Sequence, residues 1–190
     1  MPHASTFIHP SAEVSPEAEI GAGCKIWAFA HIRERARLGQ NCIVGRNVYI
    51  ECDVVIGNNV KIQNNASLYS GIQLEDGVFV GPHVIFTNDR LPRAIRPDGG
   101  LKGPSDWQIT PSLVRYGAAL GAGCIVIAGV SIGRWAMVGS GSVITRDLPD
   151  FALAVGNPAR VIGYVSAGGV RCKDQAEAQA RTETERFKEQ

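Results

Sequence analysis

Large apolar residues recur at every sixth position over most of the chain. The run continues without a break from Ile8 to Phe86, and the same spacing resumes at Val114 and ends at Ile144. An α-helix repeats about every 3.6 residues and an alternating strand about every two, so neither explains a period of six. A short strand followed by a tight turn does. The apolar positions are Ile8, Val14, Ile20, Ile26, Ile32, Leu38, Val44, Ile50, Ile56, Ile62, Leu68, Leu74, Val80, Phe86, Val114, Leu120, Val126, Ile132, Val138 and Ile144.

A second set of positions supports the same repeating unit of a short strand and a tight turn. Four residues after most of these apolar residues lies a small or β-branched side chain, which suits a narrow interior. Glycine recurs one residue after several of them, where the backbone must bend. Such units bury little alone and must stack, so we expect a solenoid. Cys24, Cys42 and Cys124 occupy the small position, and we expect them to be buried structural thiols.

One segment departs from the period. The step from Phe86 to Val114 is not a multiple of six, so residues 89–113 form an excursion rich in Pro and Gly. A loop this long in a compact repeat is usually functional or disordered. After Leu148 the sequence leaves the repeat. We therefore expect one repeat domain over residues 1–163 and a tail over 164–190, with a charged helix at 173–188 that acts as a solvated tail or end cap.

Composition narrows the class of protein. The 190 residues are 45% hydrophobic and 19% charged, enough for one folded domain, and the net charge of +1 offers no field for nucleic acid or an acidic membrane. The N-terminal segment has neither a signal-peptide pattern nor a long apolar run, and the five cysteines form no C-x-x-C pair. We expect a cytoplasmic protein without disulfides that binds neither nucleic acid nor membrane.

The repeat resembles the hexapeptide-repeat proteins, which are left-handed parallel β-helices with three hexads in each triangular coil. The resemblance covers roughly residues 8–148 and extends weakly to about 163. It implies an all-β fold, and the left hand follows from the resemblance alone. Most such proteins are acyltransferases.

Local motifs are more specific. The segments KIQNNASLY (61–69), LEDGVFVGPHVIFTND (74–89), LPRA (91–94) and VGNPAR (155–160) are similar to N-acetyltransferases that act on nucleotide-linked 3-amino sugars, either UDP- or dTDP-linked. This resemblance implies acetyl-CoA as co-substrate, no metal, precursors of surface polysaccharides such as O-antigen as the products, and a homotrimer with active sites between subunits.

The resemblance assigns the catalytic role to Asn88, which would hold the substrate amine. An amide cannot act as a general base, so the family mechanism sends the proton to the departing thiolate. The alternative is an Asn that closes the turn into the excursion.

His31 is the rival candidate, because only His titrates near neutrality without help. Residues 18 apart stack, which places Asn88 over Ser70, Cys52 and Glu34, and His31 beneath Tyr49, Ser67 and Ile85. With strands about 4.8 Å apart, His31 lies roughly 14 Å below Asn88, too far to serve as its base. We assign His31 to the nucleotide or sugar end of the substrate; an exposed structural His is the alternative.

The remaining candidates form three groups. Tyr69 and Ser70 lie one coil below Thr87 and Asn88, and Asn64, Asn65 and His83 mark another corner, where an asparagine ladder is the alternative to ligand contact. In the excursion, Arg90 or Arg93 would meet phosphate or carboxylate. The expected substrate-binding residues are His31, Glu34, Asn64, Asn65, Tyr69, Ser70 and Arg93.

The C-terminal coils and the GNPAR segment resemble the CoA region. The pantetheine arm would meet a slim surface and backbone amides at Gly117, Ala118, Ala128 and Gly129. Arg160 would reach CoA phosphate or adenine. A Pro-fixed turn that seals the solenoid is the alternative for GNPAR. The expected cofactor-binding residues are Gly117, Ala118, Ala128, Gly129, Pro158 and Arg160.

Three other functions remain open. The chain could acetylate a 4-amino sugar, serine or a sugar hydroxyl, although such enzymes usually place a His beside the acceptor. A zinc carbonic anhydrase of this fold needs convergent histidines, and His3, His9, His31 and His83 contain no closely spaced pair. A scaffold without catalysis would need neither a CoA-like end motif nor a long excursion.

Overall fold

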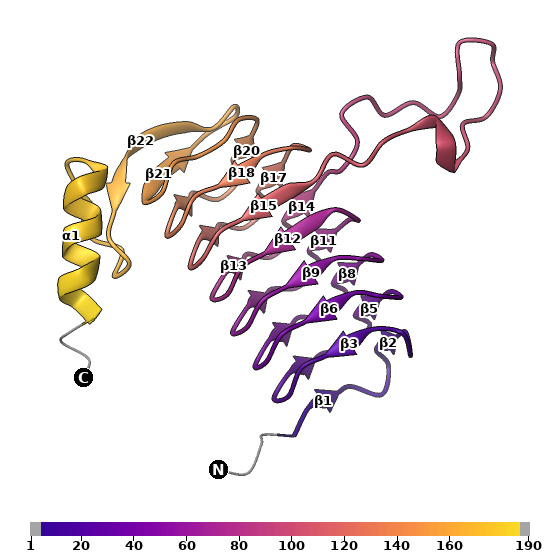
Figure 1. Cartoon of the computed structure of the whole chain (residues 1–190), viewed down its shortest axis with the longest axis horizontal. Helices are drawn as coiled ribbons and strands as arrows, with labels where there is room; N and C mark the ends of the chain where they lie inside the picture. The colour runs from indigo at the N-terminus through magenta and orange to yellow at the C-terminus, as the bar shows by residue number, and fades with distance from the viewer. Residues whose placement is uncertain (1–4, 187–190) are drawn as a thin grey trace.

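The computed structural model describes residues 5–186 and forms a three-sided stack of parallel coils, as the period of six predicts (Figure 1). Each short strand pairs with the equivalent strand of the next coil, for example Phe7 with Lys25 and His31 with Tyr49. The chain therefore makes one strand on each of three sheets in every regular coil, and the expected parallel β-helix is confirmed.

The strands of the described chain fall into three sheets. The first sheet contains β1 (Phe7–Ile8), β4 (Lys25–Ile26), β7 (Ile43–Val44), β10 (Lys61–Ile62), β13 (Phe79–Val80), β16 (Ala119–Leu120), β19 (Met137–Val138), β21 (Ala152–Val155), β22 (Arg160–Val165) and β23 (Arg171–Cys172). The second contains β2 (Glu13–Val14), β5 (His31–Ile32), β8 (Tyr49–Ile50), β11 (Ser67–Leu68), β14 (Ile85–Phe86), β17 (Ile125–Val126) and β20 (Val143–Ile144). The third contains β3 (Glu19–Ile20), β6 (Arg37–Leu38), β9 (Val55–Ile56), β12 (Ile72–Leu74), β15 (Ser112–Val114) and β18 (Ser131–Ile132).

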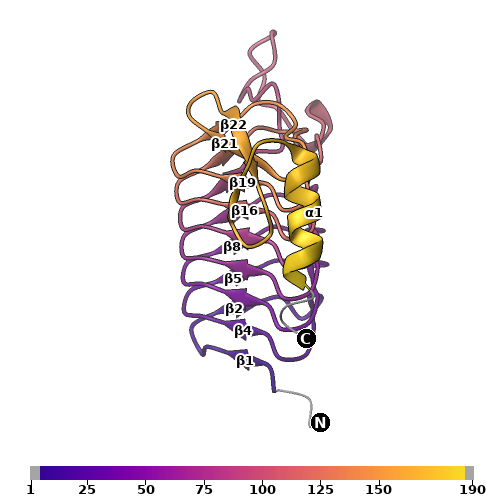
Figure 2. The same cartoon turned by 90° about the vertical axis from the view of Figure 1, so that its left-hand side faces the viewer.

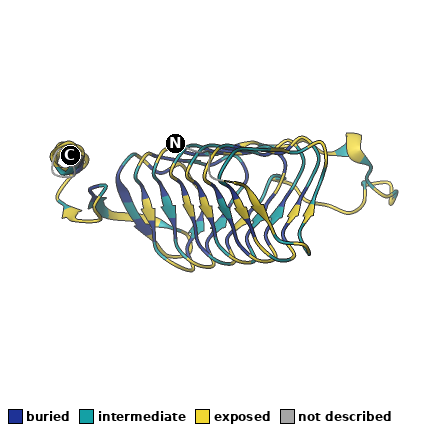
Figure 3. Ribbon diagram, turned by 90° about the horizontal axis from the view of Figure 1, so that it is seen from below, coloured by how far each residue is buried: buried dark blue, intermediate teal, exposed yellow. Residues whose placement is uncertain are grey.

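The core is a column of the repeated apolar residues. From Ile26 upward they are almost fully buried, and the small residues at the neighbouring position, such as Ala30 and Ala36, fill the space where the triangle narrows. The lowest coil of the described stack is less well covered: Ile8 is 44% exposed, and Val14 and Ile20 are only partly buried. In Figure 3 the buried positions, coloured dark blue, recur along the coils of the stack.

The three inward cysteines behave as expected. Cys24, Cys42 and Cys124 have no exposed surface, and each thiol donates to a carbonyl oxygen of the next coil, that of Gly39, Gly57 and Gly139 respectively. Burial raises the pKa of Cys42 to about 12 and also raises that of Cys124. These thiols are structural.

Each edge of the triangle is a column of turns. The first corner joins the first sheet to the second and includes residues 45–48, 63–66 and 81–84. The excursion corner joins the second sheet to the third and includes residues 33–36, 51–54, 69–71 and 127–130. The third corner returns to the first sheet and includes residues 75–78, 115–118 and 133–136.

The excursion leaves from the excursion corner, between β14 and β15. Leu74 pairs with Ile56 below it and with Val114 above it, and the second pair is more than twice as far apart in the sequence as the first. The excursion thus more than doubles the length of one coil. Ser112 and Leu113 already belong to β15, which corrects the expected end at 113, and we keep the name for residues 89–111. It contains one 3₁₀ turn, η1 (Pro104–Asp106), and projects away from the stack (Figure 1).

The C-terminal end corrects a second expectation. The chain does not leave the solenoid after Leu148: Leu148 bridges to Ile132, and β21 pairs in parallel with β19, with Leu153 opposite Met137. In each pair the two residues lie two positions closer in the sequence than they would in a regular coil, so the last coil is two residues short. This deletion breaks the period of six without ending the sheet.

Beyond β21 the chain turns back on itself and closes the stack. Strands β22 and β23 add in antiparallel fashion, and α1 (Gln175–Arg186) packs on them through the buried Ala178 and Thr182. The helix runs along the stack (Figure 2), and it lies on the opposite side of the solenoid from the excursion (Figures 1 and 3). The helix expected at 173–188 is found, and residues 187 and 188 lie outside the described part.

Candidate active site at the excursion corner

Asn88 stands where the regular coil gives way to the excursion. Its main-chain carbonyl accepts from the amide of Thr110 at 2.8 Å, which closes the base of the excursion. Its side-chain Nδ2 donates to the carbonyl oxygen of Ser70 at 3.1 Å, one coil below. No described residue donates to its Oδ1, so this atom is available as an acceptor for a bound amine.

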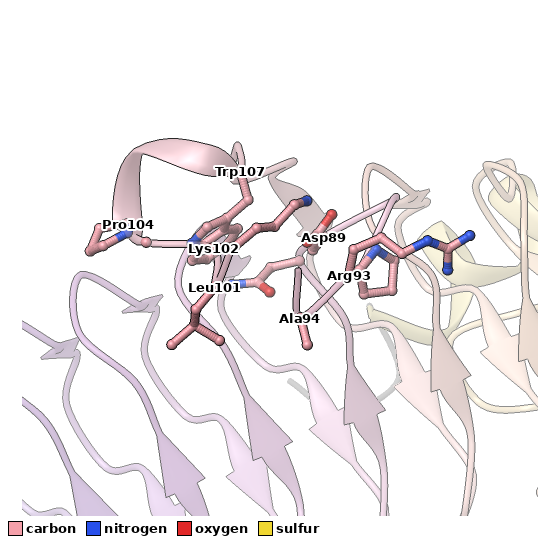
Figure 4. A pocket seen from close by; sticks show the side chains of 10 residues that line it. Asp89, Arg93, Ala94, Leu101, Lys102, Pro104 and Trp107 are labelled. Atoms are coloured by element: carbon pink, nitrogen blue, oxygen red, sulfur yellow. The ribbon is translucent and has the colours of Figure 1, made fainter. Parts of the chain in front are cut away.

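Two cavities meet at this residue. One, of about 670 Å³, lies under the excursion and is lined by Arg93, Lys102 and Trp107 (Figure 4). The other, also about 670 Å³, lies against the solenoid and is lined by Tyr69, Thr87 and Ile127. Asn88, Asp89 and Pro92 line both. A ligand in each cavity would approach the other at Asn88.

The turns below Asn88 are tied together by hydrogen bonds. The buried Ser70 donates its amide to Oε2 of Glu51 at 3.0 Å and its hydroxyl to the carbonyl of Cys52 at 2.9 Å. This confirms the expected stacking of Asn88 on Ser70 and Cys52. Because Ser70 has partners below and above, the position of Asn88 is fixed through it.

Glu34 lies at the lower end of the same column. Its carboxylate accepts two hydrogen bonds from the guanidinium of Arg33, at 2.7 and 2.9 Å, which hold the pKa of Glu34 below its ordinary value. Glu34 is therefore ionised and already paired. Its contact with substrate stays a prediction.

An aromatic row runs up the second sheet to the site. The rings of His31 and Tyr49 are 5.5 Å apart, and those of Tyr49 and Tyr69 are 5.8 Å apart, so the row ends at the cavity that Tyr69 lines. His31 pairs with Tyr49, Tyr49 with Ser67, and Ser67 with Ile85, which confirms the expected separation of three coils between His31 and the level of Asn88. His31 is thus too far away to take a proton at Asn88, and its contact with the substrate stays a prediction.

Asn64 and Asn65 lie at the first corner and do not join the two cavities of this chain. Asn64 Oδ1 accepts from the amide of Arg46 at 2.9 Å, and Asn65 Oδ1 accepts from Asn47 Nδ2 at 3.1 Å. Asn65 adopts a left-handed backbone (φ 62°), which Asn tolerates better than most residues. The ladder weighed as the alternative is therefore present, and ligand contact stays a prediction.

The expected cofactor residues are spread over different corners. Gly117 and Ala118 lie at the third corner, whereas Ala128 and Gly129 lie at the excursion corner. Ala118 and Ala128 are fully buried, so they cannot touch a ligand on the surface of this chain. One chain alone does not bring the four residues together.

The amides of these residues are not free donors, which corrects part of the expectation. Those of Gly117 and Ala118 donate to Asp76 and Arg115, that of Ala128 to Thr87 Oγ1, and that of Gly129 to Ser112 Oγ. Pantetheine contact with Gly117 and Gly129 stays a prediction that rests on their slim surface.

Pro158 lies in the turn between β21 and β22, and Arg160 begins β22, in the segment weighed as a solenoid seal. The amide of Ala159 donates to the carbonyl of Val143 at 2.8 Å, which ties this turn to the last coil. The exposed guanidinium of Arg160 donates to the carbonyl of Ala159 at 3.0 Å. The turn does seal the end, and its contact with CoA stays a prediction.

Comparison with known proteins decides the family. The model described as bacterial transferase hexapeptide (six repeats) matches residues 17–52, 35–68 and 53–88, and the hexapeptide repeat of succinyl-transferase matches residues 117–146. The unmatched gap contains the excursion. The chain belongs to the hexapeptide-repeat transferase family.

Several acetyltransferases are similar to parts of the chain. A dTDP-3-amino-3,6-dideoxy-α-D-galactopyranose 3-N-acetyltransferase of Aneurinibacillus thermoaerophilus is 59% identical over 54 residues, 28% of this chain and 28% of that protein. A galactoside O-acetyltransferase of Lactococcus lactis is 37% identical over 89 residues, 44% of this chain and 42% of that protein. In both alignments the chain spans less than half of the relative's length.

A solved structure extends the similarity. PerB from Caulobacter crescentus, in complex with CoA and GDP-perosamine, has a TM-score of 0.54 and 27% identity, and the match covers 85% of this chain and 58% of that one. The fold is therefore shared, over most of this chain, with a protein that was solved with CoA and GDP-perosamine bound.

The sequence alone did not predict three residues that line the cavity under the excursion: Asp89, Lys102 and Trp107. Asp89 follows Asn88 directly and lines both cavities, so its position beside a candidate residue was a usable signal. Lys102 and Trp107 lie in the excursion, where no period places a side chain. Arg90 was one of two candidates for phosphate: its Nε donates to the carbonyl of Ala128 at 3.1 Å and anchors the excursion, the residue lines the second cavity, and its contact with phosphate stays a prediction.

Two kinds of feature are absent from residues 5–186. No three His, Cys, Asp or Glu side chains of this part converge as a metal site requires, and His3 lies outside it. Its helices include none with the length and apolar character needed to cross a membrane.

Proposed function

We propose that the chain transfers the acetyl group of acetyl-CoA to an amine on a nucleotide-linked sugar. The observation that carries this proposal is the position of Asn88, whose Oδ1 lacks a donor among the described residues and stands where two cavities meet. Its support is the similarity to a nucleotide-sugar 3-N-acetyltransferase and to PerB, which binds CoA and GDP-perosamine.

The chemistry needs little from the protein beyond position. A neutral amine donates one hydrogen to Asn88 Oδ1, which directs its lone pair at the thioester carbonyl. The N–C bond forms, the C–S bond breaks, and the proton of the resulting ammonium passes to the thiolate, giving an amide and CoA. Holding both substrates in place supplies most of the acceleration in such a transfer.

We propose the 3-amino group of a dTDP- or UDP-linked sugar as the acceptor, as the motif resemblance implies. A second candidate is a sugar whose amine lies at another carbon, such as position 4, and the similarity to the GDP-perosamine enzyme favours testing it. Because the nucleotide sugar and acetyl-CoA are cytoplasmic metabolites, we place the reaction in the cytoplasm and its product among precursors of surface polysaccharides.

We further propose that the chain acts as a homotrimer with sites between subunits. The expected cofactor residues of one chain lie at two corners and at the C-terminal turn, so a neighbouring subunit is needed to bring such groups to one ligand. Exposed apolar side chains along the solenoid, including Phe79, Ile85 and Met137, support association.

The proposal is tested by thiol release from acetyl-CoA in the presence of nucleotide-linked 3-amino and 4-amino sugars, with the matching hydroxyl sugars as controls. We expect release with a 3-amino sugar and none with its hydroxyl counterpart. Turnover with a 4-amino sugar alone selects the second candidate. Release without dependence on any amine overturns the proposed acceptor.

A further inference from the structure

The excursion is a folded unit rather than a loose loop. Ile95 and Leu101 form an antiparallel bridge, and Arg96 pairs with Asp98 at 3.4 Å and with Asp106 at 3.3 Å. Its base is closed by the bond from Thr110 to Asn88 and by Arg90, which donates to Ala128. Side chains on the excursion are therefore held in a defined position relative to Asn88.

The positive charges of this unit divide into two classes. Arg96 is neutralised by its two aspartates, and Arg90 is engaged with a main-chain carbonyl. Arg93 and Lys102 have no carboxylate of the described residues within ion-pair distance. Both line the cavity under the excursion, so that cavity has cationic groups that the fold itself does not use.

The same cavity contains an aromatic surface. Trp107 is 38% exposed and lines the cavity together with Lys102. In Figure 4 these two side chains project from the excursion into the same hollow, whereas Arg93 extends away from them at its rim. An ammonium beside an indole suits a ligand with an anionic part joined to a planar ring.

Asp89 also lines the cavity and carries the opposite charge. One of its oxygens accepts from the amide of Leu91 at 2.7 Å, so the carboxylate is oriented by its own turn. With Arg93 and Lys102 the lining keeps a net positive charge. The other oxygen of Asp89 suits a donor such as a ribose hydroxyl or a base N–H.

We propose that Lys102 and Trp107, with Arg93 at the rim, form a binding site for a nucleoside diphosphate. Lys102 binds the diphosphate, and Trp107 stacks on the base. The proposal rests on the proposed function, in which both substrates carry this chemical group: the nucleotide sugar as its carrier, and CoA as its ADP portion. Either substrate would reach Asn88 from this cavity, because the cavity ends there.

The test is calorimetric binding of dTDP, UDP, GDP and CoA to the full chain and to its variants. We expect Lys102→Gln and Trp107→Leu each to weaken at least one of these ligands about tenfold, the scale of one charge-assisted hydrogen bond or one base stack. The conservative Trp107→Tyr should restore most of the affinity. Lys61→Gln, on β10 of the first sheet and exposed, is the matched control and should bind as the wild type does.

The outcomes separate the two sources of the ligand. Loss for dTDP, UDP or GDP with CoA unchanged assigns the site to the nucleotide sugar, and loss for CoA alone assigns it to the cofactor; both support the proposal. Equal affinities in all variants overturn it. Circular dichroism and the thermal midpoint show whether a variant is folded, and Lys102→Gln carries the test alone if Trp107→Leu is not.

This test does not depend on turnover. If the wild type transfers no acetyl group yet binds a nucleotide through Lys102 and Trp107, the proposed function fails and the binding site stands. If acetyl transfer is normal in Lys102→Gln and Trp107→Leu with unchanged KM values, the binding site fails and the proposed function stands.

Discussion

The side-chain amide of Asn88 donates a hydrogen bond to the carbonyl oxygen of Ser70, 3.1 Å away and one coil below. This bond fixes which way the amide faces, because its nitrogen is bound to the solenoid and its oxygen is left for a ligand. Asn88 can thus orient an amine without being a base. The following predictions start from this relationship.

Replacing Asn88 should remove the acceptor that orients the amine. For Asn88→Ala we expect kcat to fall roughly a hundredfold, the scale of losing one positioning contact, with binding of acetyl-CoA retained. Asn88→Asp should also be slow, because a carboxylate cannot donate to Ser70 and would repel its carbonyl. Asn41→Gly, at the third corner, is the matched control. Wild-type kcat in Asn88→Ala would remove Asn88 from the mechanism.

Glu51 should act on Asn88 through Ser70. It accepts the amide of Ser70 at 3.0 Å, so Glu51→Ala leaves that donor without its partner and lets the turn shift. We expect kcat to fall roughly tenfold or more while the KM for acetyl-CoA stays constant. Glu51→Gln keeps an acceptor oxygen and should restore the rate. Equal kcat values for the Ala variant and the wild type would show that the turn does not need this bond.

His31 should affect substrate binding and not the chemical step. It lies three coils below the level of Asn88, and its ring contacts Tyr49 in the aromatic row. In steady-state kinetics, His31→Ala should raise the KM for the nucleotide sugar about fivefold, as for one lost hydrogen bond, with kcat nearly unchanged. A thousandfold fall in kcat at constant KM would instead make His31 the base.

Docking of α1 should depend on the charge of Glu185. Hydrogen bonds from the amide of Gly168 at 2.9 Å and the hydroxyl of Ser166 at 2.9 Å, with Arg181 nearby, hold its pKa below the ordinary 4.5. A lowered folded-state pKa means that the contact stabilises the protein above pH 4.5, and that this contribution is lost as the pH falls below that value.

Hydrogen exchange measures this docking. We expect the amide of Gly168 to be protected at neutral pH and to exchange faster, relative to the intrinsic rate, as the pH falls through the lowered pKa of Glu185. Glu185→Gln should expose it already at neutral pH and abolish the pH dependence. Gln179→Ala, on the same helix and exposed, is the control. Equal protection of Gly168 in Glu185→Gln and in the wild type would show that this carboxylate does not hold the helix.

The repeat made much of the solenoid predictable. A constant coil length places Ser70 under Asn88 and Tyr49 over His31 without any knowledge of side-chain packing, because each coil translates the last by one strand spacing. The inward cysteines follow from the same count.

Features that break the repeat could not be predicted from the sequence in this way. Lys102 and Trp107 depend on how the excursion folds, which is set by the Arg96 ion pairs and the Ile95–Leu101 bridge. The short last coil hides β21, since a small deletion removes the period while the hydrogen bonding continues. The partners of the Ala128 and Gly129 amides, Thr87 and Ser112, flank the excursion on its two sides.

The most direct test of acetyl transfer to an amine is the fate of the acetyl group. Acetyl-CoA labelled with ¹³C in the acetyl group is incubated with a dTDP- or UDP-linked 3-amino sugar, and the product is identified by NMR. The account predicts an amide at the amino carbon in the wild type and a loss of that product in Asn88→Ala. Label found as a sugar ester or as free acetate would contradict it.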